Sequence, residues 1–230
     1  MSNRLDYIYN LIPKDSHGVA DIGTDHGIIP VRLIQNGFSN TVVASDLRQS
    51  PLDKAIQAAE ELNISDRINF LLTNGLQGIE KYDIDTIVIA GMGGETITSI
   101  LDTDYWCCAP GYNLILQPMT QTHILRFWLT NNEFKITQEL LVKDEDKIYN
   151  IMMVNYGVSP SYIDAELYTG KYEQIVENSL FSEYLDQMIH KFEIRVKGQS
   201  LSTHNTGDKN MNRVILKQLH DMKERFLHES

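Results

Sequence analysis

Apolar residues follow two alternating patterns over the first 157 residues of the chain. Short continuous apolar runs are typical of buried strands, and apolar residues repeated every three or four positions are typical of helices with one buried face. The expected strands cover residues 19–22, 41–46, 68–72, 85–89 and 112–116. The expected helices cover residues 3–12, 29–36, 51–62, 95–101 and 122–131. Two later segments, 136–142 and 149–156, flank a charged turn and predict a β-hairpin.

The alternation of strands and helices predicts the fold class. Parallel strands need long crossover connections, usually helices, so this order predicts an α/β fold with a mostly parallel, Rossmann-like sheet covered on both faces. The hairpin would add antiparallel strands at one edge. Ligands bind such sheets at the carboxyl ends of the strands. The residues that follow each strand are therefore the first candidates for a functional site.

The pattern changes after Gly157, which divides the chain into two expected domains, 1–157 and 158–230. In the second domain, apolar residues repeat at helical spacing over 181–192 and 211–226. Polar and small residues fill the stretch between them. We therefore expect an antiparallel helical hairpin, or short coiled coil, with its own apolar core.

Composition and charge limit the class of protein. The 230 residues are enough for one large core and an appendage, and they contain no apolar run of the ~18 residues that a transmembrane helix needs. The N-terminus has no signal-peptide pattern, and Cys107 and Cys108 are adjacent, so we expect free thiols in a reducing cytoplasm. The net charge of −11 argues against general affinity for nucleic acid, although residues 158–230 are nearly balanced, with 9 basic and 11 acidic side chains.

The first candidate site surrounds the glycine turn at 23–27. Asp46 ends the second strand, 19 residues after Gly27, where a carboxylate can accept both hydroxyls of a ribose. Asp21 and Asp25 lie where the phosphates of a dinucleotide would otherwise lie. These carboxylates would repel a pyrophosphate and attract an ammonium or a sulfonium. The sequence therefore favours S-adenosylmethionine as cofactor over a nicotinamide dinucleotide.

Two later segments add candidates at the neighbouring strand ends. The glycine-rich segment 90–94 follows the fourth strand, and a turn there would bring backbone close to the methionine half of the cofactor. Gln117 and Pro118 follow the fifth strand, where a flipped base could approach. A simple strand-ending turn explains these two residues equally well.

Three strings, at 20–26, 90–94 and 116–119, are specific when taken together. With their spacing and the apolar helix that follows them, they resemble the bacterial tRNA adenine-22 N1-methyltransferase family, called TrmK. The resemblance is close over residues 3–157. The helical hairpin resembles that of the family in its architecture, without a matching sequence motif. It implies a class I methyltransferase fold, S-adenosylmethionine as methyl donor and N1 of an adenine in the D-arm region of tRNA as acceptor.

The resemblance also implies the residues that contact the cofactor. They are Gly23, Asp25, His26, Asp46, Leu47, Asn74, Gly75, Ala90, Gly91 and Met92. The family usually has an acid where this chain has Asn74, and an amide there can still hydrogen-bond an adenine ring.

Methylation at N1 of adenine needs no general base, because this nitrogen has an in-plane lone pair and no proton. The product ring is cationic, and a nearby carboxylate would stabilise it. Asp25 is our catalytic candidate, and a purely cofactor-positioning role is the alternative. Lys191 and Arg195, on the first helix of the hairpin, are candidates for binding the tRNA backbone; a solvated helical face or a dimer contact explains them about as well.

The sequence therefore predicts a cytoplasmic, tRNA-binding methyltransferase with no metal and no membrane contact, present as a monomer or weak dimer. A methyltransferase acting on another nucleobase or on a small molecule is the first alternative, and the acidic charge favours it. A catalytically silent RNA-binding or adaptor protein on the same fold is the second, and the intact site residues argue against it.

Overall fold

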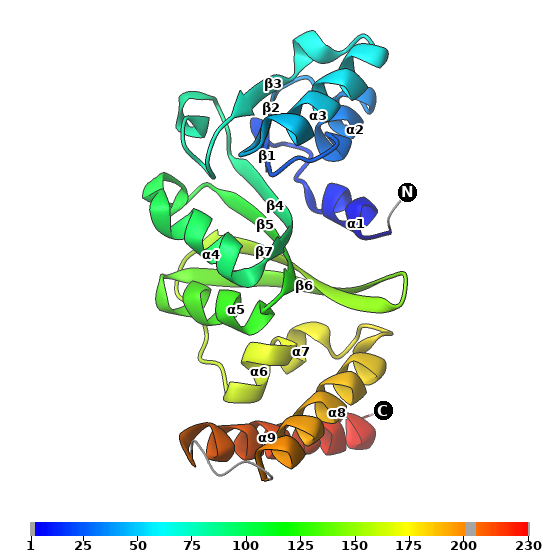
Figure 1. Ribbon diagram of the computed structural model, residues 1–230, viewed down its shortest axis with the longest axis vertical. Coiled ribbons are helices and arrows are strands. Elements are labelled where there is room, and N and C mark those ends of the chain that lie inside the picture. Colours follow the sequence, from blue (N-terminus) through cyan, green and yellow to red (C-terminus); the bar gives the residue numbers. More distant parts are fainter. Residues whose placement is uncertain (1–2, 201–205, 230) are drawn as a thin grey trace.

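The computed structural model describes residues 3–200 and 206–229 (Figure 1). Within these residues the strands form one seven-stranded sheet in the order β3-β2-β1-β4-β5-β7-β6. Strands β1 to β5 run parallel, and β7 is antiparallel to both of its neighbours. This sheet confirms the expected α/β fold with an antiparallel hairpin at one edge. The strands are β1 Gly18–Ile22, β2 Thr41–Asp46, β3 Asn69–Leu72, β4 Thr86–Gly93, β5 Asn113–Thr120, β6 Phe134–Asp144 and β7 Lys147–Tyr156.

Helices cover both faces of the sheet, because alternate side chains of each strand point to opposite faces. Val19 and Val88 belong to the core beneath α1, α2 and α3, whereas Ala20, Ile87 and Ile89 belong to the core beneath α4 and α5. All five side chains are buried. The helices are α1 Asn3–Leu11, α2 Ile28–Gln35, α3 Gln49–Glu61, α4 Gly94–Thr103 and α5 Thr122–Asn131.

Strands β4 and β5 extend further than the sequence predicts. Ala90 pairs with Gln117 and Met92 pairs with Pro118, with register shifts on both sides of Met92. Gly91 has a φ of 79°, which lets the chain bulge here without a side-chain clash. Proline lacks an N–H group, and such an irregular position tolerates it. The two turns expected here are therefore the paired ends of two strands.

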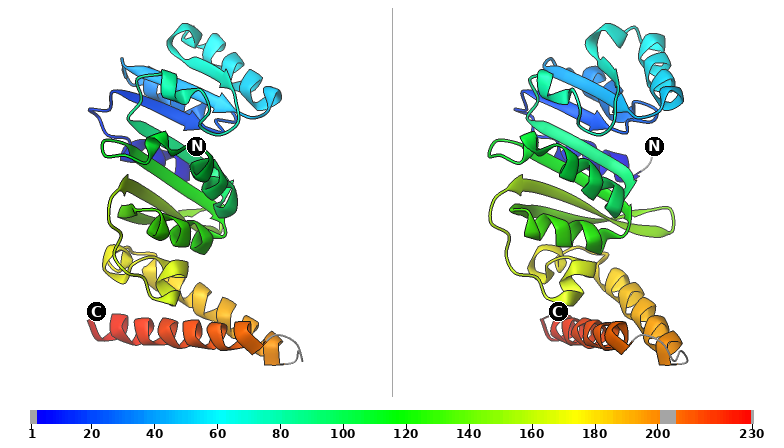
Figure 2. Two further views of the ribbon diagram at one scale, coloured as in Figure 1. Left: turned by 90° about the vertical axis from the view of Figure 1, so that its left-hand side faces the viewer. Right: turned by 60° about the vertical axis from the view of Figure 1, so that its left-hand side comes forward.

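The C-terminal helices lie beyond the β6 edge of the sheet (Figures 1 and 2). Helices α8 and α9 pack against each other and confirm the expected helical hairpin. Both run into the stretch predicted as a loop, of which residues 201–205 lie outside the described part. The sequence missed α6 and α7, since each spans less than two turns and shows no clear period. The four helices are α6 Asp164–Thr169, α7 Tyr172–Ile175, α8 Phe181–Ser200 and α9 Thr206–Glu229.

The helical hairpin shares a hydrophobic core with the edge of the sheet. Leu141 of β6 is buried together with Phe181 and Leu185 of α8 and with Ile215 and Leu219 of α9. Removing these helices would expose the apolar side chain of an edge strand. Residues 158–230 therefore pack directly on the sheet.

A buried ion pair anchors this packing. Arg126 of α5 and Glu139 of β6 form a salt bridge, and both side chains have no exposed surface. Arg126 Nη1 also donates a hydrogen bond to the Leu167 carbonyl of α6 at 2.7 Å. Asn150 Nδ2 of β7 donates to Glu139 Oε1 at 3.0 Å, and the Tyr184 hydroxyl of α8 donates to Asn150 Oδ1 at 2.9 Å. The network thus connects two helices of the C-terminal part to the sheet and to α5.

Arg126→Met should destabilise the protein by about 3–5 kcal/mol, because it leaves the Glu139 carboxylate buried without its partner. The double variant Arg126→Met with Glu139→Leu should recover most of this loss, since no buried charge remains. Urea unfolding measures both. Lys143→Met is the matched control, because it breaks an exposed ion pair with Glu183 of α8 and should cost less than about 1 kcal/mol. Equal losses in the single and double variants would contradict this explanation.

Candidate active site

A cavity of about 550 Å³ opens at the carboxyl ends of the parallel strands β1 to β4. Its volume lies in the range of small-molecule binding sites. Parallel strands place their carboxyl ends along one edge of a sheet, so residues far apart in the sequence meet there. The structure thus brings together all the residues predicted to contact a cofactor, and the contacts themselves stay a prediction. These lining residues are Asp21, Gly23, Asp25, His26, Asp46, Leu47, Asn74, Gly75, Ala90, Gly91 and Met92.

Backbone hydrogen bonds hold the turn after β1 close to β2. Gly23 and Thr24 both donate their N–H groups to the Ser45 carbonyl, at 2.8 and 2.9 Å. Gly23 and Gly27 have φ angles of 72° and 67°, which glycine adopts without strain. A Cβ on Gly27 would also lie 2.9 Å from the Cβ of Ala55 on α3. Glycine at this position therefore lets α2 begin beside the cavity while it packs closely on α3.

Two buried carboxylates give the cavity a negative wall. Asp21 Oδ2 accepts a hydrogen bond from the Thr24 hydroxyl at 2.7 Å, and Asp46 Oδ1 accepts one from the Arg48 N–H at 2.8 Å. Burial raises the pKa of Asp21 to about 6 despite the Thr24 hydrogen bond, and the Asp46 carboxylate adds to this increase. A cationic ligand would therefore reduce the electrostatic repulsion between the two carboxylates and offset the free-energy cost of burying them.

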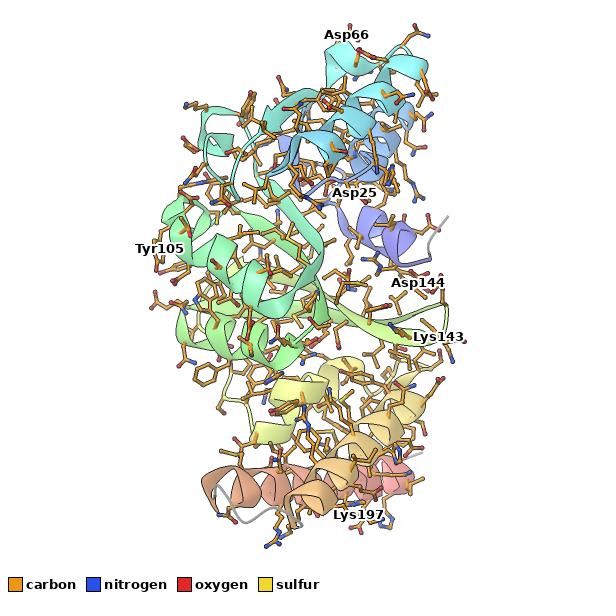
Figure 3. All side chains as sticks on the ribbon, in the orientation of Figure 1. Asp25, Asp66, Tyr105, Lys143, Asp144 and Lys197 are labelled. Atoms are coloured by element: carbon orange, nitrogen blue, oxygen red, sulfur yellow. The ribbon has the colours of Figure 1, made fainter. Side chains whose placement is uncertain are left out.

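Asp25 and His26 form the rim of the cavity. The side chain of Asp25 is 61% exposed, and its Oδ2 lies 3.7 Å from His26 Nε2. Figure 3 labels Asp25 at the turn between β1 and α2, on the side nearer to α1. Its φ of 50° is uncommon for a residue other than glycine. Strained residues of this kind concentrate at functional sites, so the geometry keeps Asp25 as a candidate.

Gln117 lies behind the wall of the cavity. This position differs from the expectation that a flipped base could approach its side chain. Its side chain is fully buried, and its Oε1 accepts hydrogen bonds from the Gly91 N–H at 3.1 Å and from the Arg4 guanidinium. The side-chain amide of Gln117 therefore stabilises the bulged backbone of β4 at Gly91. Arg4 of α1 lines the cavity itself and was not predicted. A single basic residue in the first turn of a helix carries no sequence signal for such a position.

A second cavity, of about 340 Å³, adjoins the first, and Met119 lines both. Three predicted substrate-binding residues meet in it, namely Pro118 of β5 and Lys191 and Arg195 of α8. The sequence indicated no contact between this strand end and the helical hairpin. His123 and Tyr168 also line the cavity, and their rings stack with centroids 4.4 Å apart. Sequence reasoning missed this pair, because Tyr168 belongs to the unpredicted helix α6.

Across residues 3–200 and 206–229, no group of three or more His, Cys, Asp or Glu side chains could hold a metal ion. No helix in that part of the chain has the length and apolarity to cross a membrane. Cys107 and Cys108 are free thiols, the first buried and the second half-buried.

The fold and the cavity together define a class, a Rossmann-like methyltransferase. Comparison with known proteins identifies the family, because residues 1–152 match a family model described as a methyltransferase domain. The chain belongs to this methyltransferase family.

Individual relatives within this family show which methyltransferases the chain is similar to. The tRNA (adenine(22)-N(1))-methyltransferase of Bacillus subtilis is 29% identical over 157 residues, which cover 68% of this chain and 66%, just under two thirds, of that enzyme. The structure of M. capricolum TrmK with S-adenosyl-homocysteine has a TM-score of 0.79 at 26% identity and covers 98% of this chain and 97% of that one. A protein of the NADB-Rossmann superfamily from Streptococcus agalactiae has a TM-score of 0.84 at 27% identity, over 96% of each chain. These similarities confirm the expected resemblance to the TrmK family.

Asp21→Asn should make the ligand-free protein more stable near neutral pH. Because the pKa of Asp21 rises from 3.8 to about 6 on folding, its ionisation opposes folding, and the stability it contributes falls as pH increases from about 4 to about 6. The variant should therefore gain up to about 3 kcal/mol over wild type across this range and keep that gain above it. Urea unfolding at a series of pH values measures the difference. A difference independent of pH would contradict the raised pKa.

Proposed function

We propose that this chain is an S-adenosylmethionine-dependent methyltransferase that methylates N1 of adenine 22 in tRNA, in the cytoplasm. The observation that carries the proposal is the cavity at the strand ends, which gathers the same residues that the TrmK resemblance implies as cofactor contacts. The name of the B. subtilis relative supports tRNA and adenine 22 as the acceptor. The structure of M. capricolum TrmK with S-adenosyl-homocysteine supports the cofactor.

The residues of the cavity fit S-adenosylmethionine in charge and in shape. Asp46 ends β2, where a carboxylate accepts the hydroxyls of a ribose. Asp21, whose pKa burial raises, gains from a nearby ammonium or sulfonium. Gly23 and Gly91 have positive φ angles and present bare backbone to the cavity. The bound cofactor supplies an activated methyl group, and the protein supplies alignment and electrostatics.

Asp46→Asn should weaken binding of S-adenosyl-homocysteine about 10- to 100-fold, because it removes a charge-assisted hydrogen-bond acceptor. Isothermal titration calorimetry measures the change. Asp53→Asn is the matched control, since Asp53 is exposed on α3, accepts a hydrogen bond from Gln49 and does not line the cavity. A thermal shift with NAD⁺ that equals the shift with S-adenosyl-homocysteine would contradict the cofactor assignment.

Asp25 is the proposed catalytic residue. Its exposed carboxylate at the rim is free to receive the exocyclic amine of an adenine and to stabilise the positive charge that N1 methylation creates in the ring. No proton leaves N1, so His26 is not needed as a base, and we assign it a contact with the cofactor. In the alternative role, Asp25 only positions the cofactor.

Asp25→Asn should lower kcat about 100-fold and weaken binding of S-adenosyl-homocysteine far less, since the charge that would stabilise the methylated ring is lost while the shape and the hydrogen-bonding oxygen toward the cofactor are kept. Asparagine also tolerates the left-handed conformation at this position, so the turn should stay intact. Steady-state methyl transfer and calorimetry measure the two quantities. Loss of cofactor affinity with an unchanged kcat would show that Asp25 only positions the cofactor. If kcat and cofactor affinity both stay unchanged, Asp25 is not part of the site.

The acceptor is tested by methyl transfer to unmodified tRNA transcripts, with the modified nucleotide mapped by mass spectrometry. We expect a single methyl group at N1 of adenine 22 and none when that adenine is replaced by guanine. Methylation elsewhere would support the alternative of another nucleobase. Turnover only with small molecules would support the other enzymatic alternative, and no turnover at all would support a silent RNA-binding or adaptor protein.

We further propose that residues 158–230 act as a tRNA-binding unit attached to the catalytic domain 1–157. Deleting them is a poor test, because Leu141 and the Arg126–Glu139 pair would lose their cover. Single substitutions on α8 test the idea without exposing the core. Size-exclusion chromatography with light scattering tests the expected monomer or weak dimer.

A further inference from the structure

The second cavity lies where the sheet, α5 and α8 meet. Pro118, Met119 and Thr120 form its β5 side, the first turn of α5 forms another side, and Lys191 and Arg195 of α8 form a third. Met119 also lines the proposed cofactor cavity. A nucleotide whose base enters the first cavity therefore has its sugar and phosphate close to the second.

The second cavity has an excess of positive charge. Among the described residues, its lining contains the cations Lys191 and Arg195, the imidazole of His123 and no aspartate or glutamate, in a chain with 31 acidic and 20 basic side chains. Within residues 3–200 and 206–229, neither Lys191 nor Arg195 forms an ion pair with a carboxylate. Burial and the adjacent Arg195 lower the pKa of Lys191. Burial, Arg195, Lys191 and Arg126 lower the pKa of His123, and the Glu95 carboxylate of α4 opposes this decrease only in part. An anion in this cavity would relieve the repulsion between these groups.

Aromatic contacts hold these groups in place. The Arg195 guanidinium lies 4.8 Å from the centre of the Phe192 ring and 5.9 Å from that of Tyr168. Tyr168 stacks on His123 and meets Phe192 edge to face. The Tyr184 hydroxyl lies 2.9 Å from both the Tyr168 carbonyl and Asn150 Oδ1, which share its one hydrogen. A binding group that is already ordered loses little conformational freedom when a ligand arrives.

The start of α5 adds hydrogen-bond donors to this cavity. Thr122 and His123 begin the helix and line the cavity, and no side chain caps the helix end. The first N–H groups of a helix have no partner within it, and the helix dipole favours a negative charge there. The chemical preference of the cavity is therefore for an oxyanion with several acceptor oxygens.

We propose that the second cavity binds the backbone phosphodiester beside the acceptor adenosine, with Lys191 and Arg195 neutralising it while the flipped base occupies the first cavity. This inference rests on the proposed function, because it needs an RNA acceptor. It identifies a phosphate subsite formed jointly by β5, α5 and α8. The subsite would hold the nucleotide in its flipped position, since pairing and stacking are lost when a base leaves the helix.

Lys191→Gln and Arg195→Gln should each raise KM for tRNA about 10-fold, because each removes one charge-assisted phosphate contact. The slope of log affinity against log salt should fall by about 1 in each variant. The affinity for S-adenosyl-homocysteine should not change, and this measurement also shows that the variant is folded. Lys14→Gln is the control, since Lys14 is an exposed residue in the α1–β1 loop, which precedes the amino end of β1, and it lines neither cavity. An unchanged KM and salt slope for both α8 variants would overturn the inference.

A modified tRNA locates the phosphate. Replacing one linkage next to adenine 22 by an uncharged methylphosphonate should raise KM for the wild-type protein more than Lys191→Gln does, because Lys191 and Arg195 both lose their phosphate. The same tRNA should cause a smaller loss with Lys191→Gln, which keeps only the Arg195 contact, and no loss with the double variant Lys191→Gln and Arg195→Gln. Losses that multiply would place the lysine at another phosphate and overturn the inference. If the wild-type protein methylates adenine 22 of the unmodified tRNA, the proposed function stands, whether or not the phosphate subsite is confirmed. If it does not methylate adenine 22, the proposed function itself is wrong.

Discussion

A buried charge is tolerated only beside its partner, and this constraint sets how the two parts of the chain fit together. Arg126 and Glu139 neutralise each other inside the interface. Through the Leu167 carbonyl and Asn150, the pair also reaches α6 and, by way of Tyr184, α8. Apolar packing alone would allow the helical hairpin to slide or tilt on the edge strand. Directional hydrogen bonds to a buried pair select one orientation.

That orientation explains why the two cavities adjoin. The first is built from strand ends and the turns that follow them, so the sheet determines its shape. The second also needs α8, whose residues border the same space as the end of β5 and the start of α5. Lys191 and Arg195 lie seven and eleven residues after Tyr184, which places them on the same face of α8 as this anchor. The buried ion pair is therefore joined, through Asn150 and Tyr184, to the lining of the second cavity, and it helps to fix the position of Lys191 and Arg195.

Much of the sheet and of the first cavity could be predicted from the sequence, because their signals are local. A continuous apolar run, a glycine turn and a terminal acid such as Asp46 lie within a few residues of each other. The rest depends on partners that are distant in sequence. Residues 90–93 pair with β5 instead of forming a free turn, and the buried amide of Gln117 accepts a hydrogen bond from Gly91 there. Arg126 lies in an apolar helix because Glu139, 13 residues later, is its buried partner. The lining of the second cavity, as the described residues show it, comes from β5, α5, β7, α8 and the short helix α6.

The distribution of charge reconciles an acidic protein with a polyanionic acceptor. A net charge of −11 would repel RNA if it were spread evenly. Buried carboxylates instead line the first cavity, where a cationic methyl donor fits, and Lys191 and Arg195 line the second, where a phosphate fits. Met119 is common to the two linings. Each cavity therefore has the charge opposite to its proposed ligand, and the negative cavity also favours the adenine ring as it becomes positive during methyl transfer.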